Sequence, residues 1–376
     1  MSARAARLSG PALARRAARA VVLPLISIVC GFVVAGVAVV LTGANPLDAY
    51  TALFQGAFTI HNAFTETLVA SIPYVFLGLG VAFGFRAGLF NIGADGQFYL
   101  GAIFGVYIGY AVHVPGILHV PLTLAAGMLG GAIWGGIPGA LKARFGAHEV
   151  IVTIMLNYIA YSLANFLING GPMRDPAASA PQTRYIAATA QLPIVPGSRL
   201  HLGLLLALVA VPVVWYLIDR TTIGFRVRGV GLNAPAARTA GISVGWTILL
   251  TMAISGSLAG LAGATEISGV SHFMPAGFSI GYGFDAIAVA LLARSKPWAV
   301  LPAAFLFGAM RNGATFMQLQ TQVSSDLISI VQATVIMFIA APALVRWLFR
   351  IRTGSVAEAQ ITQRAASAAS EASTTG

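Results

Sequence analysis

The sequence predicts an all-α polytopic membrane protein with about ten transmembrane helices. Of its 376 residues, 57% are hydrophobic and only 9% are charged, whereas a soluble globular domain carries about 25% charged residues. Several apolar runs reach the roughly 20 residues with which a helix crosses a bilayer. The basic residues lie in short clusters between these runs, as topology signals do. The formal charge of +11 therefore does not indicate a nucleic-acid-binding protein.

The apolar runs define the predicted spans. The first run follows five arginines within residues 1–20 and is too long for the apolar core of a signal peptide, so we expect an uncleaved helix with a cytoplasmic N-terminus. The eighth span is too short to cross alone, and we expect a broken segment continuous with 281–283. The spans lie at about 21–42, 65–85, 88–112, 119–141, 149–168, 202–219, 246–265, 283–293, 298–316 and 325–345.

The distribution of the basic residues supports this layout with both termini in the cytoplasm. Ten spans place 18 of the 22 basic residues on the cytoplasmic side, which is the asymmetry that the positive-inside rule describes. Arg174, Arg184 and Arg199 fall outside, and Arg311 falls within a span. A different number of spans would scramble this asymmetry.

The chain divides into a transmembrane domain at 21–350 and flanking segments. The loop at 169–201 is rich in Pro, Ala, Ser and Thr and is expected to be extracytoplasmic. Residues 351–376 have no apolar face, and we expect a disordered cytoplasmic tail. A weak similarity joins 93–95 with 283–285, each a glycine-rich break with an acid. Two inverted five-helix halves would produce it, and so would chance.

Glycines recur every four positions in three of the spans. Small residues at this spacing share one helix face and let two backbones approach closely. A tightly packed bundle explains them without any added function. They are Gly101, Gly105 and Gly109, then Gly127, Gly131, Gly135 and Gly139, then Gly256 and Gly260.

A polar break at 90–97 interrupts the apolar sequence. It brings Asn91, Asp95 and Gln97 together on a short stretch of backbone, and hydrocarbon offers these groups no hydrogen bonds, so they must face protein or water. Asp285 lies in a second glycine-rich break. We interpret both acids as candidates for a solute path or gate, with the alternative that the polar groups only cross-link helices.

Catalytic and cofactor motifs are absent from the sequence. The string at 241–245 matches the G-x-S-x-G nucleophile elbow but stands in a basic loop between helices, not between a strand and a helix. The two lysines, Lys142 and Lys296, follow Leu and Ser rather than Gly, so no phosphate-binding P-loop exists. One cysteine, Cys30, and six histidines without ligand spacing offer no metal site. We expect no enzyme activity and no cofactor in this chain.

The loop at 220–245 is basic and carries the signals of a capped helix. It contains four arginines and no acid. Asn233 can cap a short helix, Pro235 suits its first turn and Gly241 can end it. The positive-inside rule explains the arginines, but it does not explain the capped helix, which we interpret as a docking element for a cytoplasmic partner.

Four stretches together resemble permease subunits of nucleoside and simple-sugar ATP-binding-cassette importers, over most of 45–350. The first, at 85–97, reads FRAGLFNIGADGQ, with Asp95 where the family more often has Glu. The second runs from AHEV at 147–150 into TIMLNY at 153–158 and is more similar to the nucleoside branch. The others are 224–242, which begins GFRVR, and GFDAIAVALL at 283–292.

This resemblance implies a bacterial inner-membrane permease that works as half of a transmembrane pair and moves a nucleoside. Its implied partners are a second, homologous permease, a cytoplasmic ATPase that binds ATP and Mg²⁺, and an extracytoplasmic substrate-binding lipoprotein. The candidate path or gate residues are Asn91, Asp95, Gln97, Asn157 and Asp285. The candidate ATPase-coupling residues are Gly224, Arg226, Arg228, Asn233, Arg238 and Gly241.

Other functions are left open by the sequence. Within the importer class, the cargo can instead be a simple sugar of the ribose or galactose type or a branched-chain amino acid. A proton-coupled secondary transporter would use Asp95 and Asp285 as proton carriers, but it would need no docking helix at 220–245. An intramembrane hydrolase lacks a Ser/His or metal constellation in this sequence.

Overall fold

The structure of the chain is a computed structural model that describes residues 26, 29–41, 43–279, 281–322, 324, 326, 329–330, 333–334 and 337. The described residues form helices joined by turns and loops, and no β-strand occurs among them. The predicted segments 1–20 and 351–376 and most of the predicted span 325–345 lie outside these residues. The total of ten spans therefore stays a prediction.

Among the residues that the structure describes, five helices are long and apolar enough to cross a membrane, judged by length and composition. They are α3 (Ala63–Arg86), α5 (Gly116–Phe145), α6 (Glu149–Asn169), α7 (Gly203–Arg220) and α10 (Val244–Glu266), which continues into the π-helical turn Ile267–Ser271. The length criterion is also met by the less apolar α4 (Ala94–Ala111) and α12 (Pro297–Thr321). The shorter apolar helices are Val29–Leu41 and α11 (Tyr282–Leu292), and the remaining short helices are α2 (Pro46–Phe54), α8 (Thr222–Leu232) and α9 (Ala234–Thr239).

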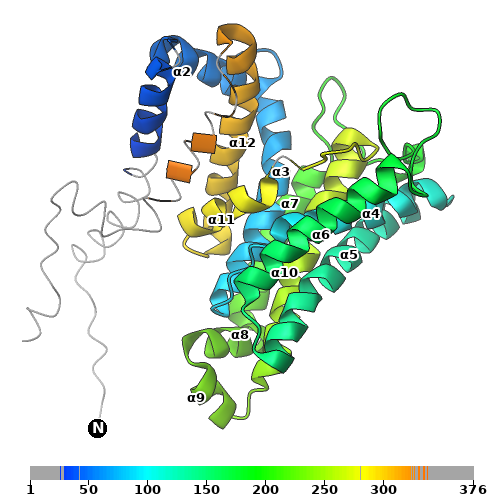
Figure 1. Cartoon of the computed structure of the whole chain (residues 1–376), viewed down its shortest axis with the longest axis vertical. Coiled ribbons are helices and arrows are strands. Elements are labelled where there is room, and N and C mark those ends of the chain that lie inside the picture. The colour runs from blue at the N-terminus through cyan, green and yellow to red at the C-terminus, as the bar shows by residue number, and fades with distance from the viewer. Residues whose placement is uncertain are drawn as a thin grey trace, which may run out of the picture.

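Helix α3 is the centre of the fold. Every residue from 71 to 84 is buried, because α10 packs against α3 on one side while α11 and α12 pack against it on another. In Figure 1, α2, α11 and α12 lie to one side of α3, and α4, α5, α6 and α10 lie to the other. A helix that is apolar all round is expected at such a position.

Glycines bring α4, α5 and α10 into backbone contact, as their four-residue spacing predicts. A Cβ atom on Gly131 would overlap the carbonyl oxygen of Gly256, and one on Gly260 would overlap that of Gly127. A Cβ atom on Gly101 would overlap the backbone of Gly260. These glycines therefore allow three helices to pack at a distance that side chains would prevent.

The segment after α10 is a broken helix, which confirms the prediction for the eighth span. The π-helical turn Ile267–Ser271 ends at His272, whose φ is +62°, and α11 begins only at Tyr282 after Gly281, whose φ is +89°. The 11 residues of α11 extend about 16 Å, roughly half of the hydrocarbon thickness. The first two residues of α11, Tyr282 and Gly283, are buried.

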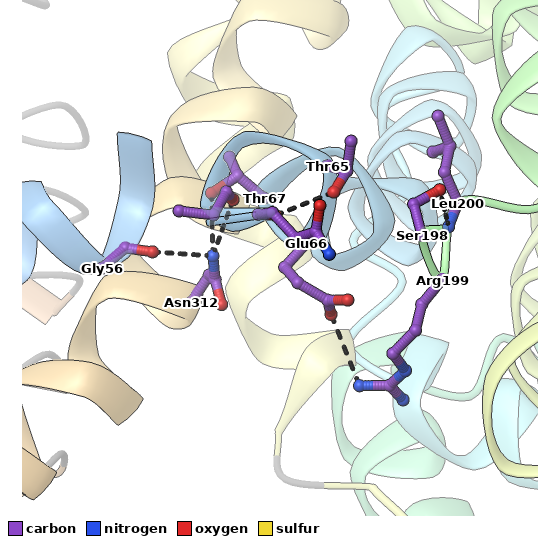
Figure 2. A network of polar contacts seen from close by, with 10 residues as sticks. Gly56, Thr65, Glu66, Thr67, Ser198, Arg199, Leu200 and Asn312 are labelled. Carbon is purple, nitrogen blue, oxygen red and sulfur yellow. Dashed lines mark hydrogen bonds and ion pairs between the residues drawn. The ribbon is translucent and has the colours of Figure 1, made fainter. Parts of the chain in front are cut away.

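One boundary and one additional helix differ from the layout expected from sequence. Helix α4 begins at Ala94 rather than near 88, because a turn with Gly88 at φ +70° follows α3. Helix α2, capped by Asn45, is an additional element between the first two predicted spans. The side-chain amide of Asn312 on α12 donates to the carbonyl oxygen of Gly56 at 3.0 Å and to the Thr67 hydroxyl at 3.1 Å, which joins the π-helical turn Gln55–Thr59 to α3 (Figure 2).

The glycine contact between α5 and α10 is tested by two alanine substitutions in the same helix. Gly131→Ala forces α5 away from α10, whereas Gly136→Ala adds a methyl group whose nearest neighbour is 4.0 Å away. We expect Gly131→Ala to lower the free energy of unfolding by about 1–3 kcal/mol and Gly136→Ala to leave it nearly unchanged. Apparent melting temperatures of the two purified variants in detergent measure this. Equal melting temperatures would contradict the close packing.

Candidate functional site

The amides of the polar break form a closed hydrogen-bond network. The side-chain nitrogen of Asn91 donates to Gln97 Oε1 and to Ser255 Oγ, both at 2.8 Å, and the Gln97 amide donates back to Asn91 Oδ1 at 3.1 Å. Ser255 in turn donates to the carbonyl oxygen of Gly80 at 2.8 Å. Asn91 and Gln97 are each 1% exposed. The network therefore joins the break to α3 and α10.

Asn157 fastens the same break to α6. Its Oδ1 accepts from the backbone nitrogen of Gly96 at 2.8 Å, and its Nδ2 donates to the carbonyl oxygen of Ile92 at 3.0 Å. Buried amides that spend their donors and acceptors on neighbouring helices act as cross-links. This bonding favours the cross-linking alternative for Asn91, Gln97 and Asn157, and their role in a solute path stays a prediction.

Asp95 connects α4 and α6 with the start of α11. Its carboxylate accepts hydrogen bonds from the Tyr161 hydroxyl at 2.5 Å, the Ser279 hydroxyl at 2.7 Å and the backbone nitrogen of Gly283 at 2.8 Å. Gly283 lies in the first turn of α11, where a negative charge compensates the helix dipole. A side chain at Gly283 would collide with Asp95, so a glycine is needed for this approach.

Asp285 belongs to a second cluster, between α3, α11 and α12. The Tyr74 hydroxyl donates to its Oδ2 at 2.8 Å, and Arg311 Nη1 lies 3.8 Å from the same oxygen. The Arg311 guanidinium also donates to the Tyr74 hydroxyl at 3.3 Å and stacks over the Tyr282 ring, 4.3 Å from its centroid. We call Tyr74, Tyr282, Asp285 and Arg311 the charged cluster.

Sequence reasoning missed most of the charged cluster. It placed Arg311 within a span and gave it no role, and it did not consider Tyr74 or Tyr282. The sequence did contain a signal for the pairing of Arg311 with Asp285. An arginine inside an apolar run requires an internal partner, and Asp285 was the acid in the second glycine-rich break. The structure thus places Asp95 and Asp285 in separate networks that meet at the first turn of α11.

The loop after α7 forms a hairpin of two capped helices. Asn233 caps α9 by accepting from the backbone nitrogen of Ala236 at 3.0 Å, Pro235 lies in its first turn, and Gly241 follows its end at φ +80°. These three features confirm the capped helix predicted from sequence. Thr221 caps α8 in the same way, through the backbone nitrogen of Gly224 at 3.2 Å.

Of the predicted coupling residues, Gly224 is buried, Arg228 is half-buried, and the others are exposed. Gly224 packs against backbone carbonyls at the end of α7, and Arg228 donates to the carbonyl oxygen of Ile218 and lies 3.4 Å from Asp219. Arg226 and Arg238 are exposed, and so is Leu232 at the end of α8, with 88% of its surface accessible. Arg226, Arg238 and Leu232 therefore present two guanidinium groups and an apolar side chain on one hairpin.

The hairpin also contacts the base of α3. A Cβ atom on Gly231 would overlap the carbonyl oxygen of Arg86, so the two backbones touch. The Arg86 side chain donates through Nε to the carbonyl oxygen of Ser295, just beyond the end of α11, at 3.0 Å. The hairpin, α3 and α11 are therefore joined at one end of the bundle.

The loop at 169–201 packs on the broken helix at the other end. The backbone nitrogen of Thr183 donates to the carbonyl oxygen of Met274 at 3.0 Å, and that of Ile186 to His272 at 2.9 Å. His201 closes the loop, with its Nδ1 accepting from the backbone nitrogen of Gly203 at 3.2 Å. Burial lowers the pKa of His201 to about 4, so its imidazole is neutral at physiological pH.

Comparison with known proteins agrees with this architecture. The family described as the permease component of the branched-chain amino acid transport system matches residues 63–341. The chain is 40% identical to the guanosine ABC transporter permease protein NupP of Bacillus subtilis over 87% of this chain and 94% of that protein. It is 36% identical to the glucose ABC transporter permease protein TsgB13 of Haloferax volcanii over 84% and 86%, and 35% identical to the nucleoside ABC transporter permease protein NupB of Lactococcus lactis over 87% and 92%. Bacillus subtilis and Lactococcus lactis each have a second, more distant relative, NupQ at 28% and NupC at 25% identity.

The role of Asp95 is tested by removing its carboxylate. Asp95→Ala leaves two hydroxyl groups and one backbone nitrogen without their acceptor, and each buried unpaired group costs about 1–3 kcal/mol. We expect a lower yield of folded protein and a lower apparent melting temperature in detergent. Asp48→Ala, which removes an exposed acid from the first turn of α2, is the control and should change little. A stable Asp95→Ala protein that has lost only transport would instead place Asp95 on the solute path.

Proposed function

The chain belongs to the branched-chain amino acid transport system permease family, and from this premise we propose that it imports a nucleoside as a membrane subunit of an ATP-binding-cassette transporter. The observation that carries the cargo class is the 40% identity to a guanosine permease over nearly the full length of both chains. The 35% identity to a nucleoside permease supports the same class. ATP hydrolysis then belongs to a separate subunit, and this chain is a transport component rather than an enzyme.

A sugar is the second candidate cargo, because a glucose permease is 36% identical to this chain. A guanosine molecule and a glucose molecule differ in charge distribution and in aromatic surface, but both carry adjacent hydroxyl groups on a ring. The part of the cargo common to these relatives is therefore a vicinal diol. A branched-chain amino acid has no such diol, and we place it last among the cargoes.

The partners follow from the family and from the exposed surfaces of the chain. We propose a second, homologous permease, since the named relatives in Bacillus subtilis and Lactococcus lactis come as pairs of permease proteins. We further propose a cytoplasmic ATPase, which binds ATP and Mg²⁺, and an extracytoplasmic substrate-binding lipoprotein. The assembly would lie in a bacterial inner membrane, with both termini of this chain in the cytoplasm.

The α8–α9 hairpin is the surface that we assign to the ATPase. It combines fixed caps with exposed Arg226, Arg238 and Leu232, so it presents charge and apolar area on a preorganised backbone. Preorganisation lowers the entropy lost on docking. Its contact with the base of α3 offers a direct mechanical connection from the ATPase to the bundle.

The charged cluster is our assignment for the solute path. Asp285 and Arg311 are partly exposed, with 15% and 21% of their side-chain surfaces accessible, whereas the amide network around Asn91 is closed. Charged groups inside a membrane bundle commonly line solute pathways. Proton carriage is disfavoured, because the Asp95 carboxylate already accepts three hydrogen bonds, and the Asp285 carboxylate accepts from the Tyr74 hydroxyl and lies 3.8 Å from Arg311 Nη1.

Uptake by proteoliposomes that contain both permeases, the ATPase and the binding protein tests the proposed function. We expect uptake of labelled guanosine that requires ATP and persists in the presence of a protonophore. The purified permease without its partners should neither bind nor hydrolyse ATP. Uptake that collapses with the protonophore and survives without ATP would identify a secondary transporter instead.

Docking through α9 is tested by reversing one charge. Arg238→Glu should reduce ATP-driven uptake about tenfold or more, because like charges across an interface cost several kcal/mol, while membrane insertion is unchanged. Arg238→Lys keeps the charge and should transport normally. Arg144→Glu makes the same charge change at the exposed end of α5 and should have a smaller effect. Wild-type uptake by Arg238→Glu would remove α9 from the ATPase interface.

A further inference from the structure

Helix α6 exposes polar side chains at membrane depth. Its exposed face combines the apolar Ile151 and Met155 with three polar residues, Tyr158, Ser162 and Asn165, which we call the polar stripe. Spacings of four and three residues place the stripe on one face of the helix, where it extends about 10 Å along the axis. No hydrogen bond joins these three side chains to another residue in the described part of the chain.

The exposed faces of α5 and α7 are apolar instead. Each exposed residue of α7 from 202 to 213 is leucine or valine, and each exposed residue of α5 from 117 to 133 is apolar. Such faces suit hydrocarbon, which offers no hydrogen bonds. The polar stripe does not suit it, because hydroxyl and amide groups without partners are costly there. The exposed face of α6 therefore meets water, a polar solute or protein.

Tyr158 is an exposed aromatic ring on a rigid support. It lies about 14 Å from the start of α6 and about 17 Å from its end, too deep for the aromatic belts at membrane–water interfaces. The residue is 62% exposed, and its ring packs edge-on against Tyr161 with centroids 6.1 Å apart. The Tyr161 hydroxyl donates to Asp95 at 2.5 Å, which fixes the supporting ring.

We propose that the polar stripe binds the cargo nucleoside, with Tyr158 stacked on the base and with Ser162 and Asn165 hydrogen-bonded to its polar groups. The inference rests on the proposed function and names the residues that contact the cargo. An exposed aromatic ring stacks on any base, because every base has a π-face. Hydroxyl and amide side chains both donate and accept. The stripe carries no charge, which suits a neutral solute that must be released again.

The position of the stripe on α6 favours a solute over a protein partner. The stripe occupies the half of the helix that ends at the 169–201 loop, on the proposed extracytoplasmic side, from which the binding protein would deliver cargo. The other half of the same face is apolar, with Ile151 and Met155. A protein contact along the whole helix would not require the polar groups to be confined to the half where cargo enters.

A series of ring contacts leads from the stripe to the charged cluster, which we assigned to the solute path. Neighbouring centroids in this series are 4.9–6.1 Å apart, which is the range of favourable aromatic pairs. A base stacked on the exposed first ring would thus extend a packed group of rings that ends in the charged cluster. The rings, in order, are Tyr158, Tyr161, Tyr99, Phe278, Phe98 and Tyr282.

Water and cargo access to the stripe is tested by cysteine labelling of the whole complex. Ser162→Cys is combined with Cys30→Ser, which removes the single native cysteine of this chain, and labelling of the α6 peptide by a charged methanethiosulfonate is measured by mass spectrometry. The reagent reacts with the thiolate, whose formation an apolar surrounding suppresses. We expect Ser162→Cys to be labelled, and about fivefold more slowly with saturating guanosine. Val209→Cys, at similar depth on the apolar face of α7, should stay unlabelled.

Stacking on Tyr158 is tested by uptake in proteoliposomes, expressed per assembled complex. Tyr158→Ala should lower the uptake of guanosine and of cytidine about fivefold or more, because it removes the ring on which either base would stack. Tyr158→Phe keeps the ring and should remain within about twofold of the wild type. Tyr216→Ala is the matched control, because it removes a tyrosine of similar exposure, 58%, from α7, and its uptake should be unchanged.

Several results would overturn the inference. They are wild-type uptake by assembled Tyr158→Ala complexes, an unlabelled Ser162→Cys, or labelling that guanosine does not slow. Loss of the second permease from purified Tyr158→Ala complexes, with normal uptake in those that remain, would assign the face to the permease pair. If Tyr158→Ala does not assemble at all, the effect of guanosine on Ser162→Cys labelling decides the case. A wild-type complex that moves no nucleoside in the presence of ATP would instead refute the proposed function itself.

Discussion

Hydrocarbon supplies no hydrogen bonds, so the chain must itself satisfy each polar group that it places within the bilayer. Most of the interior follows from this constraint. The broken helix before α11 leaves backbone nitrogens without intrahelical partners, and the Asp95 carboxylate reaches from α4 to accept from one of them, at Gly283. The same carboxylate accepts a hydrogen bond from Tyr161. The residue that satisfies the start of α11 therefore also holds α6 in place.

Lipid is as apolar as the helix surfaces, so the hydrophobic effect does not hold transmembrane helices together, and close packing must do so. Backbone contact at Gly131 and Gly260 replaces side-chain burial as the source of attraction between α5 and α10. This rigid group of helices carries the amide network around Asn91, while α11 and α12 belong to the other side of α3 (Figure 1). Asp95 and the central helix α3 connect the two sides.

Local rules were sufficient for the features that depend on neighbours in sequence. The glycine spacing predicted close packing of helix backbones without naming the partners, and Asn233 with Gly241 predicted α9, since caps act within one helical turn. The partners of Asp95 and Arg311 lie far away in the chain, at Tyr161 and Tyr74, and no local pattern specifies them. Helix α2 escaped prediction because nine residues are too few for a span and too few for a clear periodic pattern.

Helix α11 is short, and it is held at both ends. Asp95 binds its first turn through Gly283, and the Arg86 side chain binds the carbonyl oxygen of Ser295 just beyond its last turn. Because Gly231 of the α8–α9 hairpin touches the backbone at Arg86 without space for a Cβ atom, a displacement of the hairpin toward the bundle must displace this end of α3 as well. Asp285 lies on α11 between these two anchors. A displacement of the hairpin that moves this end of α3 would therefore also act on the charged cluster.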